Sequence, residues 1–362
     1  MLAGVTTALF VAVVAGQEAV PPSEKNMFVG TPAGWKHPKT AWGDPDLQGT
    51  WPISFVGSVP FERCGGGSRV GGPPAPPCDP NKAFLSDEEF KARVEAASGR
   101  VDRYKAAMKS GELGTAFNAG NTDPTAPQRQ TALIVDPPNG KLPEMTEEGK
   151  RLSAQMRSSW AVSDNEVLTF DSEHDFDTWD RCITRGMPAS MFPFRYNNGV
   201  QILQTPGYVV LNLEMIHDAR IVPLGNRPPI SSKIKEWMGE SRGHWEGNTL
   251  VIVTTNFKAG ASATNIGVMG SPQGNRFPTS EQMKITERLT RVNDQMMIYE
   301  ITTEDPVVLT RPWTARFPLK LDNGYVWWEY ACHEGNRTIP DYISSSRAER
   351  AQQAKEAGHT QP

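Results

Sequence analysis

The chain lacks the sequence signatures of several large protein classes. No run of lysine or arginine occurs, and a net charge of −4 gives no basic stripe for binding nucleic acid. No G-x-S-x-G elbow, P-loop or H-E-x-x-H motif is present, and no G-x-G-x-x-G lies between a strand and a helix. We therefore expect neither a serine hydrolase nor a nucleotide-dependent enzyme, and we expect no cofactor.

Long apolar segments are also scarce. The stretch from Met1 to Ala15 is apolar but is too short to span a bilayer. Small residues at Ala15 and Gly16 suit a signal peptidase, although the usual basic residues before the apolar run are missing. We expect residues 1–16 to be a signal peptide and the mature protein to be periplasmic or secreted. The alternative is a hydrophobic N-terminal strand or helix.

Cysteine is limited to four residues, an even number that suits an oxidising compartment. Three pairings are compatible with four cysteines, and the sequence alone does not choose among them. The pairing that we predict is Cys64 with Cys78, across a loop rich in Gly and Pro, and Cys182 with Cys332. Disulfides are favoured over zinc because no histidine lies at metal-ligand spacing from Cys64 and Cys78.

The 32 glycines and 30 prolines favour many turns and loops over a helical bundle. Residues 17–82 are expected to form an extended, loop-rich arm, and residues 83–160 a helical segment that packs on the sheet. A capping box and apolar residues at three-to-four spacing predict a helix over Ser86–Ser110. A second helix is predicted from Thr146 to about Arg157.

From about Val162 the apolar period changes to two, which is typical of strands. Three hairpins with short turns are predicted, with the strand pairs Val200–Gln204 and Tyr208–Val222, His244–Glu246 and Thr249–Phe257, and Met283–Val292 and Gln295–Thr303. A last aromatic strand is predicted over Tyr325–Cys332, and a polar helical tail from about Ser344.

These patterns predict a mainly β protein. The fold that we expect is an antiparallel barrel or strongly curved meander of lipocalin-like character over residues 161–345, with two peripheral helices. Residues 346–362 would be a polar tail. The arm, the helices and the sheet are expected to form one domain.

Two resemblances bear on this fold. The residues Asp46-Leu47-Gln48-Gly49-Thr50-Trp51 are similar to the G-x-W opening of lipocalin-type barrels. Over roughly residues 42–345 the chain also resembles a large group of uncharacterised secreted bacterial proteins, in the stretches PDLQGTW, DRCITRG, QTPGYVVLNLEMIHDARIVPL, SRGHWEGNTLVIVTTNF, TERLTRV, TEDPVVLTRPWT and EYACHEGN. The second resemblance implies export and a shared fold, and it implies no catalytic residue.

Histidine is scarce, and four of the six histidines have an acidic neighbour. Alternation along Tyr208–Val222 places His217 on an apolar face, and the same count places Glu287 on the apolar face of its own strand. A polar group on such a face needs a partner, and its pKa shifts. Glu329 and His333 share one face of the predicted last strand, and His244 shares a face with Glu246. The candidate catalytic residues are His217 as the lead base, with His333, His244, Glu287 and Glu329.

Two kinds of side chain could bind a ligand. Two arginines can hold an anion, and aromatic side chains near the strands could line a barrel mouth. The candidate substrate-binding residues are Arg185, Arg220, Trp245, Trp327 and Tyr196. The alternative interpretation is structural: the histidines lie in hydrogen bonds at strand ends, and the carboxylates pair with Arg220, Arg242 or Arg288.

Three functions remain open at this point. The first is a cofactor-independent acid/base enzyme of the lyase, isomerase or hydrolase type. The second is a non-catalytic lipocalin-like protein that binds an apolar or aromatic ligand. The third is a metal-dependent enzyme that uses His217, His244 and His333. In each case we expect a small-molecule ligand, no nucleic acid and no membrane span, and the sequence leaves the substrate and the oligomeric state open.

One acidic stretch is a candidate calcium site. Its carboxylates, Asp171, Glu173, Asp175 and Asp177, alternate along the chain. The stretch lacks the glycine and the terminal glutamate of an EF-hand loop, and a solvated surface is the alternative.

Overall fold

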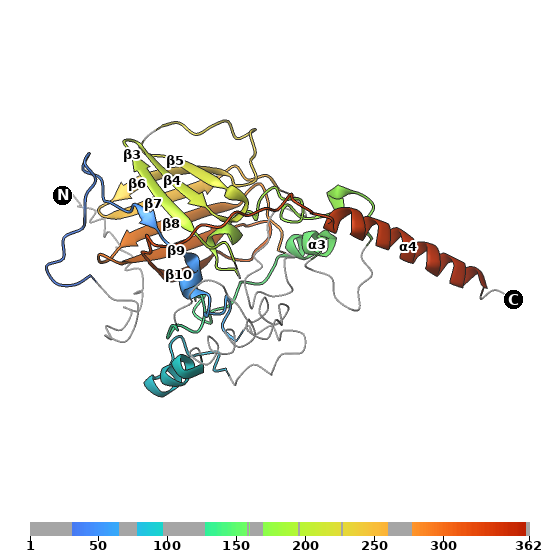
Figure 1. Ribbon diagram of the computed structural model, residues 1–362, viewed down its shortest axis with the longest axis horizontal. Coiled ribbons are helices and arrows are strands. Elements are labelled where there is room, and N and C mark those ends of the chain that lie inside the picture. The colour runs from blue at the N-terminus through green and yellow to red at the C-terminus, as the bar shows by residue number, and fades with distance from the viewer. Residues whose placement is uncertain are drawn as a thin grey trace, which may run out of the picture.

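The computed structural model describes residues 31–64, 78–96, 127–157, 159, 169–194, 196–225, 227–259 and 277–359. The predicted signal peptide lies outside these residues. Within them the strands form two antiparallel sheets (Figure 1). The first sheet has the order β1-β3-β4-β5, with bounds Gly49–Thr50, Val200–Thr205, Tyr208–Leu213 and Ala219–Pro223. The second has the order β2-β10-β9-β8-β7-β6, with bounds Ile134–Asp136, Trp313–Lys320, Met296–Glu304, Lys284–Arg291, Thr249–Thr255 and Glu240–Glu246.

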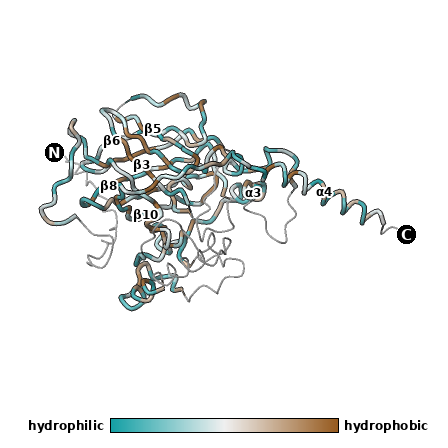
Figure 2. The backbone as a smooth tube through the Cα atoms, in the orientation of Figure 1, coloured by the Kyte–Doolittle hydropathy of each residue, from teal (hydrophilic) through white to brown (hydrophobic). Residues whose placement is uncertain are grey.

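Both sheets contribute one face to a single hydrophobic core. Because side chains alternate between the faces of a strand, every second residue points inward, and most of these positions are apolar. The core joins Ile202, Val209, Leu211 and Val222 of the first sheet to Ile252, Leu289, Ile301 and Phe317 of the second. Figure 2 shows apolar residues gathered along these strands. The prediction of a mainly antiparallel β fold is confirmed.

The two sheets approach each other at their edges. An isolated parallel bridge joins Leu224, just after β5, to Gly243 of β6. At the other edge, the N–H of Asp322 donates to the carbonyl of Thr50 in β1 at 2.9 Å. Among the described residues the strands form these two sheets and no closed barrel.

The three predicted hairpins are present, and their turns lie where the sequence placed them. Gly247, the first turn residue between β6 and β7, has a φ of +61°. Such a φ suits a glycine at the first position of a two-residue hairpin turn. The hairpins β3–β4 and β8–β9 pair in continuous antiparallel register.

The prediction of one strand over Tyr208–Val222 is wrong. The 3₁₀ turn η4 (Met215–His217) interrupts it, with Ile216 at φ +61° and His217 at φ +58°. The insertion changes the phase of the strand, since a shift of one residue moves every side chain to the other face. Leu211 and Leu213 point inward before the turn, whereas Arg220 and Val222 are buried after it. As a consequence His217 is exposed and does not lie on the apolar face.

The prediction of a last strand over Tyr325–Cys332 is also wrong. The last strand is β10, and the chain then runs without regular secondary structure to Thr338. We call residues 321–337 the strap. Its conformation depends on side-chain contacts and a disulfide, because it joins no sheet ladder in the described structure.

In the part of the chain that the structure describes, three helical segments accompany the sheets. Residues 87–96 are helical, and Ser86 and Glu89 form the expected capping box, while residues 97–110 of the predicted helix lie outside the described residues. The helix α3 (Glu147–Gln155) is confirmed, with Thr146 as its N-cap. The tail helix α4 (Thr338–His359) begins before the predicted Ser344 and projects from the body of the protein (Figure 1).

The remaining regular elements of the described residues are the short 3₁₀ turns η1 (Ile53–Val56), η2 (Glu173–Asp175) and η3 (Ala189–Met191). Both predicted disulfides are present, Cys64–Cys78 with a Cα–Cα distance of 5.5 Å and Cys182–Cys332 with one of 5.8 Å. In the described part of the chain, no helix has the length and apolar character needed to cross a membrane.

Candidate functional site

A pocket of about 360 Å³ lies beside the Cys182–Cys332 disulfide. Its volume is near the lower end of the range that is typical of small-molecule sites. The lining combines aromatic rings (Trp179, Tyr196, Tyr330), carboxylates (Asp180, Glu329, Glu334) and neutral polar groups (Ser159, Asn197, Asn336, Thr338). Loops and the strap build this pocket, so it does not occupy the barrel mouth that a lipocalin-like fold would offer.

The loop after η2 is folded by its own polar groups. The carboxylate of Asp177 accepts hydrogen bonds from the N–H groups of Trp179, at 2.9 Å, and of Asp180, at 2.8 Å. The carbonyl of Thr178 accepts from the N–H of Ile183 at 2.8 Å. These bonds close a tight turn that presents Trp179 and Asp180 to the pocket.

A buried glutamate fastens the strap to the first sheet. Glu214, which follows β4, accepts hydrogen bonds from the N–H of Gly199 (2.8 Å), the hydroxyl of Tyr325 (2.7 Å) and the N–H of Trp328 (2.6 Å). Three donors compensate the carboxylate for its loss of water. The strap therefore has a fixed course at Tyr325 and Trp328, just before its pocket-lining residues.

Two asparagines continue this attachment along the strap. Asn197 Nδ2 donates to the carbonyl of Trp328 at 3.1 Å, and Asn336 Nδ2 donates to the carbonyl of Asp180 at 3.0 Å. Between them the Cys182–Cys332 bridge joins the strap to the loop covalently. The pocket wall is thus held by hydrogen bonds at both ends and by a disulfide in the middle.

The aromatic side of the pocket is an ordered cluster. Trp179 Nε1 donates to the hydroxyl of Tyr330 at 2.7 Å, and the rings of Tyr196 and Tyr330 stack with centroids 6.3 Å apart. Phe194 packs its edge against Trp179 and Tyr196. Burial, with the neighbouring Tyr196, raises the pKa of Tyr330 to about 12, so its ring stays neutral at physiological pH.

Arg185 lies behind this aromatic cluster and does not line the pocket. Its guanidinium is buried, 5.3 Å from the Trp179 ring centroid and 5.0 Å from that of Phe194, and it donates to the carbonyl of Phe192 at 2.9 Å. Burial lowers the pKa of Arg185 to about 10, which leaves it charged at neutral pH. Cation–π contacts of this kind stabilise a desolvated guanidinium.

The three carboxylates of the pocket differ in their surroundings. Asp180 is buried and accepts hydrogen bonds from Ser159 N, at 3.0 Å, and Ser159 Oγ, at 2.5 Å. Glu329 and Glu334 are exposed in the strap, and among the described residues neither has a hydrogen-bond or ion-pair partner. No lysine, arginine or histidine is found among the described lining residues.

Four residues of the sequence prediction lie in or next to this site. Tyr196, Glu329 and Cys332 line the pocket, and Arg185 supports its aromatic wall. Trp327 belongs to the strap, where its ring meets that of Tyr325 edge to face at 6.1 Å. The sequence prediction did not single out Asp180, Tyr330 and Glu334. The sequence feature that could have identified them is their position within two residues of Cys182 or Cys332, because residues beside two paired cysteines must be neighbours in space.

Glu287 and Arg220 form a buried ion pair elsewhere in the fold. Arg220 Nη1 donates to Glu287 Oε1 at 2.9 Å, and a second, shorter contact joins Nη2 to Oε2. Tyr299 Oη donates to Glu287 at 2.7 Å, and Arg220 also bonds to Ser241 and Thr254. Burial raises the pKa of Tyr299 well above its ordinary value. This network links β5 of the first sheet to the second sheet and is not part of the pocket lining.

The candidate histidines are exposed. His244 lies 3.2 Å from Glu246, which Arg288 also contacts at 2.8 Å, and His333 lies in the strap without lining the pocket. Trp245 is half-buried against the core. In the described parts of the chain, no group of three or more His, Cys, Asp or Glu side chains is placed to hold a metal ion.

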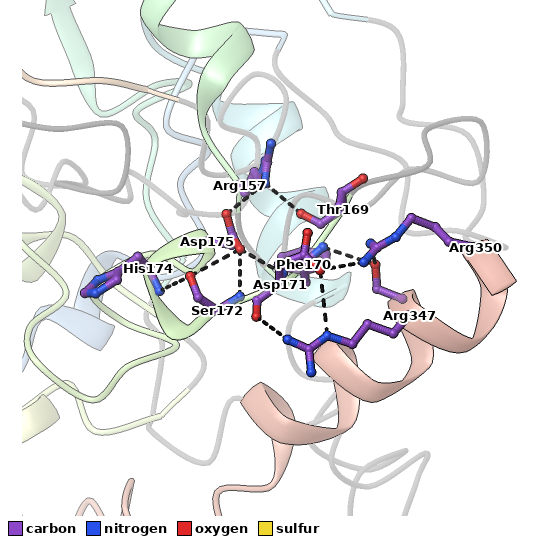
Figure 3. Close-up of polar contacts among 10 residues, drawn as sticks. Arg157, Thr169, Phe170, Asp171, Ser172, His174, Asp175, Arg347 and Arg350 are labelled. Atoms are coloured by element: carbon purple, nitrogen blue, oxygen red, sulfur yellow. Dashed lines mark hydrogen bonds and ion pairs between the residues drawn. The ribbon is translucent and has the colours of Figure 1, made fainter.

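The acidic stretch around η2 serves as an attachment point (Figure 3). Asp175 accepts hydrogen bonds from the N–H groups of Asp171 and Ser172 and pairs with Arg157 at 2.8 Å. The carboxylate of Asp171 pairs with Arg350 of α4 at 2.5 Å. These carboxylates have protein partners, and Asp171 holds the middle of α4 against the loop that leads to the pocket.

Comparison of the chain with protein-family models, with curated proteins and with solved structures found no match.

Proposed function

We propose that this protein is an exported binding protein that takes a small organic molecule into the pocket beside the Cys182–Cys332 disulfide. The observation behind the proposal is a pocket of about 360 Å³ whose walls are fastened by a buried glutamate, two asparagines and a disulfide. A preformed wall lowers the ordering cost of binding. Ring faces and hydrogen-bonding groups in one lining supply contact area and orientation together.

Export is part of the proposal. Both disulfides of the described structure suit an oxidising environment such as the periplasm or the extracellular space. The expected signal peptide and the resemblance to secreted bacterial proteins support the same location.

Binding is favoured over acid/base catalysis by the positions of the titratable groups. A general base must come within about 3 Å of the proton that it removes. His217, His244 and His333 are exposed and do not line the pocket, while Glu287 is held by Arg220 and Tyr299. Of the pocket carboxylates, Asp180 is already hydrogen-bonded to Ser159. Glu329 and Glu334 are exposed, and the described lining offers no histidine, lysine or arginine to act as a second proton-transfer group beside them.

The test blocks the pocket without removing any of its polar groups. Ala331 lines the pocket and is exposed, so Ala331→Trp should fill the space with a large ring. Ala351→Trp, at an exposed position of α4, is the matched control. The measurement is thermal unfolding of each protein against a panel of small cations, sugars and aromatic acids.

We expect compounds from the panel to raise the melting temperature of the wild type and of Ala351→Trp, and to have no effect on Ala331→Trp. Equal stabilisation of all three proteins would place the ligand elsewhere and would refute the proposal.

A further inference from the structure

We infer that the pocket selects an organic cation, such as a small amine or a quaternary ammonium compound. The inference rests on the proposed function and names its ligand class. Three carboxylates line the pocket, and its described lining contains no basic side chain. Glu329 and Glu334 make no ion pair within the described protein, so their charges are available to a ligand. Carboxylates grouped in a concave site raise the local concentration of cations.

The aromatic rings give an independent reason for the same ligand class. Tyr196 and Tyr330 are stacked in the pocket lining, and Trp179 holds Tyr330 by its hydroxyl. The face of an aromatic ring carries partial negative charge and attracts ammonium groups within about 6 Å of its centroid. Two phenol rings beside two free carboxylates therefore combine the two features that recognise an ammonium group.

The basic groups next to the pocket lie outside its described lining. Arg181, between Asp180 and Cys182, is half-buried and does not line the pocket. Arg185 lies behind the rings, with its charge directed at Trp179, Phe194 and the carbonyl of Phe192. Arg337 is exposed and pairs with Asp341 at 3.5 Å. His333 lies in the strap outside the lining. An anionic ligand held by Arg185 is disfavoured, because the guanidinium does not reach the pocket surface.

A neutral sugar is the main competing ligand, since rings and carboxylates can also contact sugar hydroxyls. The free carboxylates favour the cation. Covering a carboxylate with a neutral ligand removes water without supplying a compensating charge, whereas an ammonium group supplies one.

The test uses the full disulfide-bonded protein and pairs of charged and neutral probes. Choline is compared with 3,3-dimethylbutan-1-ol, a neutral compound of the same shape, and benzylamine with benzyl alcohol; glucose is the sugar probe. Binding is measured by calorimetry at low and at physiological ionic strength. The variant Glu329→Gln/Glu334→Gln removes the free charges, and Glu349→Gln/Glu356→Gln, on exposed α4 positions, is a control with the same change in net charge.

We expect at least one cation to bind about tenfold or more tightly than its neutral partner, and more weakly at higher ionic strength. The pocket variant should lose about tenfold in affinity for that cation, and the α4 control should not change.

Two other outcomes separate the inference from the proposal beneath it. Neutral probes or glucose that bind as well as the cations, with affinities unchanged in the pocket variant, would overturn the cation inference and leave the proposed function standing. If no probe binds and Ala331→Trp responds to the panel as the wild type does, both fail.

Discussion

Acidic and aromatic side chains lie together in two regions of the protein, the core and the pocket, and their surroundings differ. In the core, Glu287 lies among Arg220 and Tyr299, and each of its oxygens has a donor. In the pocket, Glu329 and Glu334 lie near Tyr196 and Tyr330 without a protein partner among the described residues. A buried carboxylate must be paired to be tolerated, whereas an exposed one is free to meet a ligand. The apolar-face pattern in a sequence therefore detects the first kind. It gave no signal for Glu334, and Glu329 was predicted from its place on a strand that does not form.

The largest expected effect tests the core side of this comparison. Glu287→Gln leaves Arg220 buried without its counter-charge, which typically costs about 3–5 kcal/mol of unfolding free energy. Glu246→Gln is the matched control, because that glutamate pairs with Arg288 on the surface, and exposed pairs contribute about 1 kcal/mol or less. Urea unfolding measures both.

Ligand affinity should be unchanged in Glu287→Gln under conditions where the protein stays folded. Two results would contradict this division of roles: an equal loss of stability in the two variants, or weaker ligand binding by Glu287→Gln. Either would show that the core network does not act on stability alone.

An intermediate effect is expected at Glu214, which belongs to the core by its burial and to the pocket by its role. Glu214→Gln replaces an acceptor of three hydrogen bonds with an amide whose NH₂ must face a donor, which costs about 1–3 kcal/mol. Hydrogen exchange should show loss of protection at the Trp328 amide. Tyr325→Phe, which removes one of the three donors, should give a smaller change of the same kind.

Unchanged exchange at Trp328 in Glu214→Gln would mean that the disulfide and the two asparagines hold the strap without Glu214. The position of Glu329 and Tyr330 would then not depend on the first sheet.

The hairpins could be predicted from the sequence because their determinants are local. Gly247 and Asn248 set the turn between β6 and β7, and the alternation on either side sets the register. The turn at η4 could not be predicted in this way, since Ile216 adopts a left-handed conformation that β-branched residues rarely take. Its cause is tertiary: Glu214, just before it, is occupied by Gly199 and the strap.

The last strand was misplaced for a different reason. β10 contains Pro318, and a proline in the middle of a sheet removes a hydrogen bond. The N–H of Arg316 donates to Leu133 beside β2, so the nitrogen of Pro318, two residues on, faces the same side. Because β2 pairs only with Thr314 and Ala315, Pro318 lies past its end and interrupts no ladder. The alternating residues of Tyr325–Cys332 lie in the strap. Glu214 and a disulfide hold this segment, and it pairs with no strand of the described structure.

The site was predictable only in part. Tyr196, Glu329 and Cys332 line the pocket as members of the predicted set, but the pattern that suggested His217 depended on a regular strand. The arrangement of Asp180 and Tyr330 depends on the Cys182–Cys332 bridge closing 150 residues of chain. Contacts across such a distance have no local periodicity, and only the predicted pairing of the cysteines brings their neighbours together.

The smallest expected effect concerns His217, the residue to which the sequence pattern gave the leading role. Its side chain is exposed on η4, so His217→Ala removes no buried contact and should change the unfolding free energy by no more than about 0.5 kcal/mol. It does not line the pocket, and among the described residues no hydrogen bond or ion pair joins its side chain to a lining residue, so the affinity for a pocket ligand should stay within a factor of about two. Tyr196→Ala, which removes a lining ring, is the positive control and should weaken binding of an ammonium probe several-fold. Calorimetric titration of both variants distinguishes the outcomes. Loss of binding or of any turnover in His217→Ala, with the fold intact, would show that the functional residue lies at η4 and not in the pocket.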